Sequence, residues 1–479
     1  MTEYDAIVVG SGPNGLAAAI VLARAGLSVL VRESSSTIGG GARSFELTLP
    51  GFVHDLYSAV HPMAAASPFF SSLPLETHGL EWIHPPLPLV HPFDDSPPAI
   101  LDRGVDATGL TLGRDASAYR CLLAPLVRDW LSLAPDVLGP IFHVPAHPIS
   151  AVRFGSRALW SAATLNRAVF REGRAKALLA GLSAHSIVPL EKSGSAAIGL
   201  VMAATGHAAG WPIPRGGAQQ IANALASYFR SLGGTIETDA PVDSIENLPK
   251  ARAVLLDLTP RQIVRIADKR LSKKYKRRLT HFAYGPGVFK IDWALAGPIP
   301  WIHPECARTA TLHLGASEEE IKASESAAWK GTHVEKPLVL LAQPSLFDAT
   351  RAPAGRHTGW AYCHVPNGST LEMTQAIERQ VERFAPGFRE LILARHTSNT
   401  VQLEQSNANL VGGDIGGGAN TLRQLLMRPV LAIDPYRIPS TNLYVCSAST
   451  PPGGGVHGMC GYHAARSALK NAFGRSLSR

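Results

Sequence analysis

The residues with the clearest chemical potential form a glycine-rich turn near the start of the chain. Gly10, Gly12 and Gly15 have the spacing GxGxxG and lie between a short apolar run and a helical pattern. The first glycine permits a tight bend, the second lets backbone approach a pyrophosphate, and the third lets helix and strand pack closely. The phosphates then lie at the helix N-terminus, where free N–H groups favour negative charge. We therefore predict a dinucleotide site with these contacts: Gly10, Ser11, Gly12, Pro13, Asn14 and Gly15.

An acid and a second glycine run follow at suitable distances. Glu33 comes just after the second predicted strand, where a carboxylate can bond the ribose hydroxyls. In segment 38–44 the glycines would bring backbone close to the cofactor, and Arg43 offers a charged fork to a phosphate or a flavin edge. A plain surface turn is the alternative for this segment. The predicted contacts here are Glu33, Gly40, Gly41, Ala42 and Arg43.

The end of the chain repeats the order of strand, glycine-rich turn and helix. The turn is CSASTPPGGGVHGM, residues 446–459, and the helix after it continues to about residue 473. A helix N-terminus aimed at a flavin would stabilise the negative charge that reduced flavin carries near N1 and O2. The predicted contacts are Ser447, Gly455, Val456, His457, Gly458 and Met459.

Few side chains near these turns could move protons. We predict His457 and Tyr462, at the start of the terminal helix, and Asp414, in the glycine-rich loop 412–418, as candidate catalytic groups. His463 and Asp292 are weaker candidates. For each, the alternative is a structural role in which the side chain only hydrogen-bonds backbone. The histidines of segment 61–91 lack metal-ligand spacing, so we predict no metal.

The motifs belong to distant parts of the chain. Residues 1–60, 212–283 and 430–479 carry the patterns of a doubly wound sheet, and we predict that they form one discontinuous dinucleotide-binding domain. The predicted fold class is therefore α/β.

The remaining segments should build the substrate side. Helical patterns dominate residues 100–211, and strand-like runs between 286 and 365 predict an antiparallel sheet within a substrate-binding domain of residues 284–429. The Pro-, His- and aromatic-rich segment 50–98 is expected to be irregular, and residues 61–99 are expected to join that domain. The active site should lie where the domains meet.

Composition narrows the class of function. The 479 residues carry a formal charge of +8, but Lys and Arg are scattered apart from a run at 273–278 that suits a solvated helix face. We therefore predict no nucleic-acid partner, while the positive charge and the aromatic residues of segment 61–93 permit contact with a membrane surface. Five cysteines without a CxxC pair predict reduced thiols. With neither a signal peptide nor an apolar run of about 18 residues, we expect a cytoplasmic protein.

Together these segments resemble the phytoene desaturase-like flavoproteins, in particular their phytoene dehydrogenase-related branch, which shares the fold of the amine oxidase group. The resemblance covers nearly the whole chain. It rests on GSGPNGLAAA, IGGGARS, WPIPRGGAQQIANALASYFRSLGGTI, FKIDWALAGPIPW, AYCHVPNGS and CSASTPPGGGVHGMCGYHAA. It implies FAD, with the first turn on the ADP half, backbone near Val242 on the adenine, and the terminal turn on the ribityl chain and isoalloxazine. Ser447 departs from the glycine that is common there.

The resemblance implies an FAD-dependent oxidoreductase of the desaturase or dehydrogenase type, acting on a hydrophobic, isoprenoid or lipid-like substrate. A redox-neutral isomerase that uses reduced flavin belongs to the same branch. Two alternatives stay open: an amine oxidase that releases peroxide, and a non-catalytic protein in which FAD is structural. The facing aromatic pair usual in amine oxidases is not evident at the terminal turn, which offers Val456 and His457. No second GxGxxG turn marks a nicotinamide domain, so oxygen, a quinone and diffusing NAD(P) remain open as electron partners.

Overall fold

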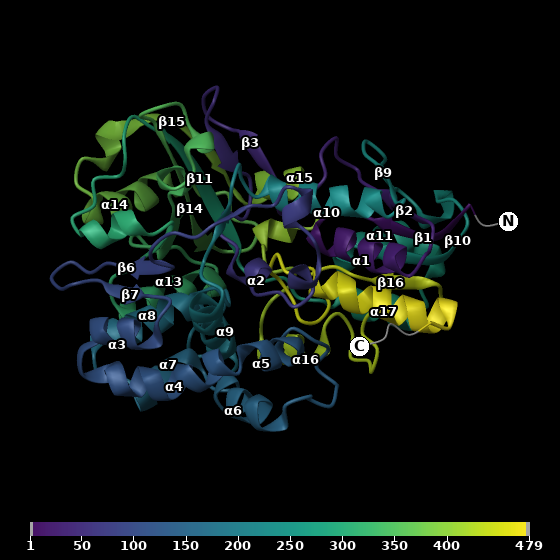
Figure 1. Cartoon of the computed structure of the whole chain (residues 1–479), viewed down its shortest axis with the longest axis horizontal. Helices are drawn as coiled ribbons and strands as arrows, with labels where there is room; N and C mark the ends of the chain where they lie inside the picture. Colours follow the sequence, from purple (N-terminus) through teal and green to yellow (C-terminus); the bar gives the residue numbers. More distant parts are fainter. Residues whose placement is uncertain (1–2, 476–479) are drawn as a thin grey trace.

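In the computed structural model, which describes residues 3–475, a parallel sheet joins the first, middle and last parts of the chain (Figure 1). Its strand order is β16-β10-β1-β2-β9. The central strand β1 pairs in parallel with β10 on one side and with β2 on the other. The strands are β1 (Tyr4–Val9), β2 (Val29–Arg32), β9 (Thr235–Glu237), β10 (Ala251–Leu256) and β16 (Leu443–Val445).

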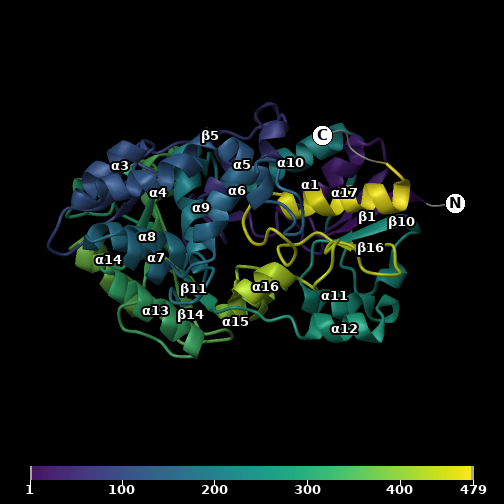
Figure 2. The same cartoon turned by 90° about the horizontal axis from the view of Figure 1, so that it is seen from below.

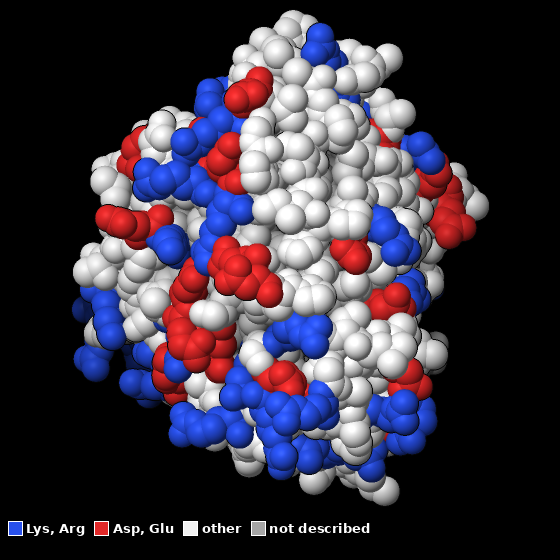
Figure 3. Space-filling view, turned by 90° about the vertical axis from the view of Figure 1, so that its left-hand side faces the viewer, with Lys and Arg blue, Asp and Glu red and all other residues white. Residues whose placement is uncertain are grey.

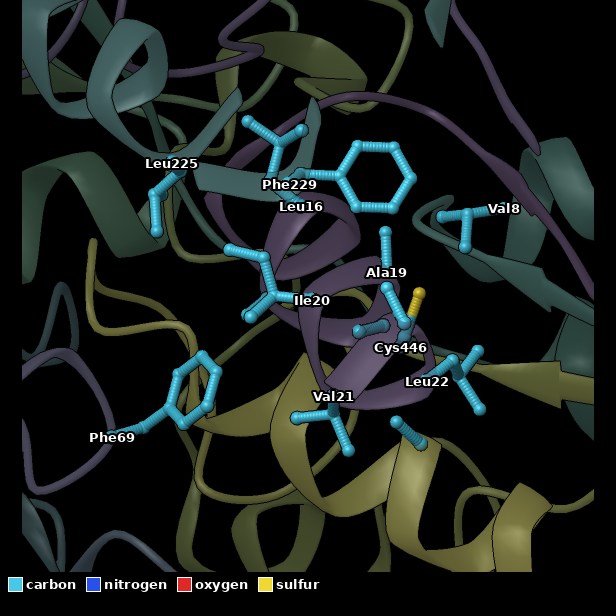
Figure 4. Close-up of a cluster of buried hydrophobic side chains, with 14 of the residues drawn as sticks. Val8, Leu16, Ala19, Ile20, Val21, Leu22, Phe69, Leu225, Phe229 and Cys446 are labelled. Atoms are coloured by element: carbon cyan, nitrogen blue, oxygen red, sulfur yellow. The ribbon is translucent and has the colours of Figure 1, made fainter. Parts of the chain in front are cut away.

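Helices cover both faces of this sheet because successive side chains of β1 point to opposite sides. Val8 packs with Leu16 and Phe229 against α1, α10 and α17, and Figure 4 shows this cluster. Ile7 packs in a second cluster against α11 and α12. Figure 2 shows the layers, with α1 and α17 on one side of β10 and β16 and α11 and α12 on the other. The helices are α1 (Pro13–Arg24), α10 (Gln219–Ser231), α11 (Pro260–Ala267), α12 (Lys273–Thr280) and α17 (Met459–Phe473).

A second, mostly antiparallel sheet has the order β15-β11-β14-β13-β12-β6-β7. Its middle strands β11, β13 and β14 match the runs in which an antiparallel sheet is predicted from the sequence. One face packs on α14 through a core that includes Trp293, Ile377 and Phe384. The elements are β6 (Leu89–His91), β7 (Ala99–Leu101), β11 (Gly287–Leu295), β12 (Thr311–Leu314), β13 (Val339–Ala342), β14 (His357–Val365), β15 (Ile392–Ser398), α13 (Glu318–Lys330), α14 (Thr374–Phe384), α15 (Thr400–Ser406) and α16 (Leu422–Met427).

The expectation that segment 50–98 is irregular is wrong in part. β6 and β7 form a hairpin at the edge of the second sheet, where Val90 pairs in parallel with Leu312. The partner strand lies more than two hundred residues further along the chain, so the strand pairing leaves little trace in the local sequence. Short elements occupy the flanking segments: β3 (Ser44–Glu46), β4 (Val53–Asp55), α2 (Pro62–Ala65), β5 (Trp82–Ile83) and β8 (Ile213–Pro214).

Helices fill residues 105–208, and most of them lie beside the second sheet (Figures 1 and 2). Their core includes Tyr119, Leu178 and Leu200. The helices are α3 (Val105–Thr111), α4 (Ala116–Arg128), α5 (Trp130–Val137), α6 (Pro148–Ala158), α7 (Ala162–Val169), α8 (Gly173–Ala184) and α9 (Ser195–Ala208). Within residues 3–475, no helix is both long and apolar enough to cross a membrane.

The surface charge is mixed on the face that Figure 3 shows. Acidic and basic side chains alternate there, with Lys and Arg denser toward its lower edge (Figure 3). On that face the net positive charge does not gather into a single basic stripe of the kind that tracks a nucleic-acid backbone.

Candidate dinucleotide and substrate site

A continuous cavity of about 620 Å³ runs from the glycine turn between β1 and α1 to the second sheet and to α9. The turn residues 10–14 form its wall at one end. At the other end, hereafter the chamber, the walls are mostly apolar and aromatic side chains from several elements: Ile198, Val201, Met202, Trp211, Leu341, Trp360 and Tyr362. The cavity therefore links a nucleotide-type site to an apolar space where the two sheets and the helices meet, as pockets at domain interfaces often do.

The glycine turn leaves room for a ligand because it has no side chains where the backbones converge. A Cβ built on Gly12 would lie 2.6 Å from Oδ2 of Asp257, and one on Gly15 would lie 2.2 Å from the carbonyl oxygen of Gly10. Gly12 and Gly40 bring two backbone segments together at the cavity wall. Such a cradle fits a pyrophosphate held by backbone N–H groups at the start of α1.

Glu33 is held in place at the end of β2. Its Oε2 accepts hydrogen bonds from the Ser11 N–H (2.9 Å) and hydroxyl (2.6 Å), and its Oε1 accepts one from the Ser35 N–H (2.9 Å). The carboxylate lines the cavity. A fixed carboxylate at this place fits the ribose of a dinucleotide.

Arg43 lines the same end, but its donors are engaged within the protein. Nε donates to the carbonyl oxygen of Gly40 (3.1 Å), and Nη2 donates to the Tyr57 hydroxyl (2.8 Å) and the Ser406 carbonyl oxygen (3.1 Å). Nη1 donates to the Ser35 hydroxyl. Arg43 therefore holds the loop 39–43 against α15, and its guanidinium group is not free to bind a phosphate.

Asp257 was not predicted, and it lies at the end of β10 beside the glycine turn. Its Oδ2 accepts the Gly15 N–H (3.0 Å), which is one of the donors that the start of α1 offers. Burial raises its pKa to about 7; the Gly15 N–H opposes that rise, and the Glu33 charge adds to it. The carboxyl group and a pyrophosphate would therefore compete for the same positive end of the helix.

The terminal turn contributes backbone more than side chains. Gly455 and Val456 line the cavity, whereas the buried His457 side chain does not and accepts the Met459 N–H at Nδ1 (3.0 Å). Burial lowers the pKa of His457 to about 4, so the ring is neutral. The Ser447 hydroxyl donates to the carbonyl oxygen of Leu258 (2.7 Å) and so ties the end of β16 to the loop after β10.

The other proposed catalytic side chains do not line the cavity either. Tyr462 packs against the Phe69 ring, with centroids 5.2 Å apart. Asp414 is buried and accepts the N–H groups of Gly285 and Gly416, each at 2.7 Å, which fixes the loop 412–418. His463 lies close to the Leu138 carbonyl oxygen. In this geometry each has a structural contact, and the catalytic roles remain predictions.

A buried charged network underlies the chamber. Lys290 of β11 lines the cavity and forms an ion pair with Asp292, whose carboxylate also lies 3.7 Å from the imidazoles of His54 and His396. Burial lowers the pKa of Lys290, and Asp292 opposes that shift. Asp292 itself does not line the cavity, so Lys290 is the member of the pair that a substrate could meet.

Of the predicted contact residues, two thirds line the cavity. Those at its wall are Gly10, Ser11, Gly12, Pro13, Asn14, Glu33, Gly40, Gly41, Arg43, Ser447, Gly455 and Val456. The others do not line it: Gly15, Ala42, Val242, His457, Gly458 and Met459. Val242 packs against the cluster that α11 and α12 cover.

Comparison with known proteins agrees with this geometry. Residues 8–71 match the NAD(P)-binding Rossmann-like domain family. The rat (Rattus norvegicus) pyridine nucleotide-disulfide oxidoreductase domain-containing protein 2 is 26% identical, with 97% of this chain and 93% of that protein covered.

Among solved structures, an oxidoreductase from Methanosarcina mazei has a TM-score of 0.64 at 15% identity, with 97% of this chain and 100% of that chain covered. Putrescine oxidase bound to putrescine also has a TM-score of 0.64, at 17% identity, with 98% and 99% covered. The chain therefore has the Rossmann-like FAD-binding fold found in oxidoreductases, and its cavity fits FAD.

Proposed function

We propose that this chain is an FAD-dependent oxidoreductase that acts on an uncharged, apolar substrate, of the dehydrogenase or desaturase type seen in phytoene desaturase-like proteins. When bound, FAD supplies the group that exchanges a hydride with the substrate. The continuity of the dinucleotide cradle with the chamber is the observation that carries this proposal, because it offers one space for both molecules.

The distribution of charge along the cavity favours an uncharged substrate. The carboxylates that line it, Glu33 and Asp257, both lie at the dinucleotide end, whereas Lys290 is the charged group at the chamber. A protonated amine in the chamber would find no lining carboxylate among the described residues and would face an ammonium group. An apolar molecule gains free energy from leaving water, by about 25 cal/mol for each Å² of apolar surface buried. The charge distribution in the chamber therefore favours a dehydrogenase with an apolar substrate over an amine oxidase.

The chain's own residues would position the reactants and exclude water. The rings of Trp360 and Tyr362 pack edge to face with centroids 5.2 Å apart, and such rigid aromatic walls fix the orientation of an apolar ligand. Loss of a hydride to the flavin would leave a carbocation, and the adjacent C–H proton of such a cation is acidic enough to pass to a weak base such as water. The reaction therefore needs no strong base, which agrees with the lack of a lining carboxylate at the chamber among the described residues. Oxygen, a quinone and NAD(P) remain the electron partners to be distinguished.

The test is anaerobic reduction of the purified holoprotein. Oxidised-flavin absorbance should bleach on addition of an apolar lipid fraction, and Met202→Trp, which fills the chamber, should keep FAD but bleach at least tenfold more slowly. Ile302→Trp, at an exposed position, is the matched control. Bleaching by amines with peroxide formed in air would establish the amine oxidase instead. Retained FAD that no substrate class reduces would favour the non-catalytic alternative.

We also propose that the chain meets its substrate at a membrane surface. Large apolar side chains are exposed along α5, α6 and the loop between them, including Leu131 (89% exposed), Val144 (90%) and Ile149 (77%). A small pocket joins this loop to Leu426 of α16, and the neighbouring Leu425 lines the main cavity. An exposed apolar surface of this kind is typical of an interaction site.

Flotation with phosphatidylcholine vesicles tests the membrane contact. The double variant Leu131→Glu/Val144→Glu should lose at least 80% of vesicle binding, while Ile302→Glu should retain it. Equal vesicle binding by the wild type, the double variant and Ile302→Glu would refute the membrane contact.

A further inference from the structure

The chamber ends on a group of buried histidines that the proposed hydride transfer does not use. His185 follows α8 and lines the cavity, and its Nε2 lies 3.0 Å from Nε2 of His313 on β12. Behind them, His91 of β6 contacts the carbonyl oxygen of Ala316 through Nε2 (2.8 Å). These rings come from three distant segments, and the second sheet and the helical group together bring them to one place.

All three rings are uncharged. Burial lowers the pKa of His185 to about 3, that of His91 to about 4, and that of His313 well below its ordinary value. Each ring therefore carries one N–H and one bare nitrogen. These neutral imidazole rings can donate and accept hydrogen bonds, but they do not supply a charge to the substrate.

The contacts then fix which nitrogen carries each proton. Nδ1 of His313 is buried without a hydrogen-bond partner among residues 3–475, and a Cβ on Gly181 would lie only 2.6 Å from it. A proton on Nδ1 would make a buried N–H group without an acceptor. Leaving an N–H group unpaired costs more free energy than leaving an acceptor nitrogen unpaired. The proton of His313 therefore lies on Nε2 and is donated to Nε2 of His185, and the proton of His185 lies on Nδ1.

Nδ1 of His185 has no hydrogen-bond partner among the described residues, and it does not belong to their buried unpaired atoms. Since His185 lines the cavity, this N–H is reached from the chamber. The Trp211 ring packs edge to face against the His185 imidazole, with ring centroids 5.7 Å apart. The result is a fixed, neutral hydrogen-bond donor in a wall that is mostly apolar and aromatic, with Lys290 as its charged member.

We propose that His185 binds an oxygen acceptor, a carbonyl or hydroxyl oxygen, on the otherwise apolar substrate. This inference rests on the proposed function, and it narrows the substrate class from a pure hydrocarbon to an apolar molecule with one oxygen function. The oxygen lies at the chamber end and so orients the molecule relative to the dinucleotide cradle. His185 acts in this as a specificity-determining residue, and His313 as the residue that sets its tautomer.

A binding experiment without turnover tests the inference. Holoprotein is titrated with geranylacetone and with the hydrocarbon in which a methylene group replaces its carbonyl. The change in tryptophan fluorescence reports binding, since Trp211 and Trp360 line the chamber. One neutral hydrogen bond predicts that the ketone binds about 3- to 10-fold more tightly than the hydrocarbon. His185→Leu should abolish this preference while hydrocarbon affinity changes less than twofold, and His185→Gln, which keeps a donor, should restore part of it.

His281→Leu is the matched control, because His281 is exposed and lies outside the cavity. An unchanged ketone preference in His185→Leu, or binding of neither probe to the wild-type protein, would overturn the inference. The FAD content and the flavin reduction are measured on the same samples. A ketone preference in a holoprotein that no apolar compound reduces would refute the proposed reaction and leave the binding inference standing.

Discussion

The carboxyl group of Asp257 makes the stability of the protein and its affinity for FAD depend on pH. In the unfolded chain an aspartate ionises near 3.8, whereas burial raises the folded-state pKa of Asp257 to about 7. Between these two values the folded state holds the proton that the unfolded state has released, so stability falls as pH rises through this window. The difference corresponds to about 4 kcal/mol lost between pH 4 and pH 8.

Asp257→Asn should remove this loss because an amide oxygen can still accept the Gly15 N–H without a charge. We expect the apoprotein variant to exceed the wild type in unfolding free energy by up to about 4 kcal/mol at pH 8, and to match it near pH 4. FAD brings two phosphate charges to the same helix end, so wild-type affinity should fall by about tenfold per pH unit above pH 7, where binding must take up a proton. The variant should bind FAD with a flat pH profile.

Urea unfolding of the apoprotein and flavin fluorescence titrations between pH 5 and pH 9 measure the two effects. Asp95→Asn, at an exposed position, is the control and should leave both profiles unchanged. If wild-type stability and Asp257→Asn stability change in parallel across this range, or if the variant binds FAD more weakly at every pH, the reasoning about Asp257 is refuted.

Three further substitutions test the site. Gly15→Ala should abolish FAD retention and cost about 1–3 kcal/mol of stability, because its Cβ would lie 2.2 Å from the Gly10 carbonyl oxygen; the FAD-to-protein absorbance ratio and urea unfolding measure this. Glu33→Gln should weaken FAD binding by about fivefold, since about 1 kcal/mol is lost when a carboxylate acceptor becomes neutral, and isothermal titration would contradict this by finding equal affinities. Lys290→Met should lower the unfolding free energy by about 3–5 kcal/mol because Asp292 stays buried without its partner, and adding Asp292→Leu should recover most of that loss.

Local patterns predicted the parts of the fold in which neighbours in sequence are neighbours in space. The strand, turn and helix of residues 4–24 are of this kind, since the apolar run, the glycine spacing and Pro13 act within one short segment. Asp257 could not be found this way because its contact with Gly15 joins residues 242 positions apart. Lys290 is inside a segment that the sequence singled out, but its place at the cavity depends on the pairing of β11 with β14 and β15.

The prediction for His457 shows a different limit. The sequence places this residue correctly in the terminal turn, but the direction of its side chain is set by the flanking backbone. Gly455 and Gly458 both have positive φ, at 130° and 71°, so the chain bends twice around His457. The ring then contacts the Met459 N–H instead of the cavity. The glycines indicate that the backbone can bend here, but residue type and spacing do not predict which way the His457 side chain then points.

The two ends of the cavity differ in the kind of recognition that they can perform. At the dinucleotide end, the carboxyl group of Asp257 titrates near neutral pH, so binding there responds to pH and ionic strength. At the chamber end, His185 and His313 stay neutral over the whole physiological range because burial holds their pKa values far below it. Hydrogen bonding to the substrate by His185 should therefore be independent of pH, while cofactor binding is not. A protein built in this way would select its substrate by shape and by one hydrogen bond, whatever the protonation state of the cofactor site.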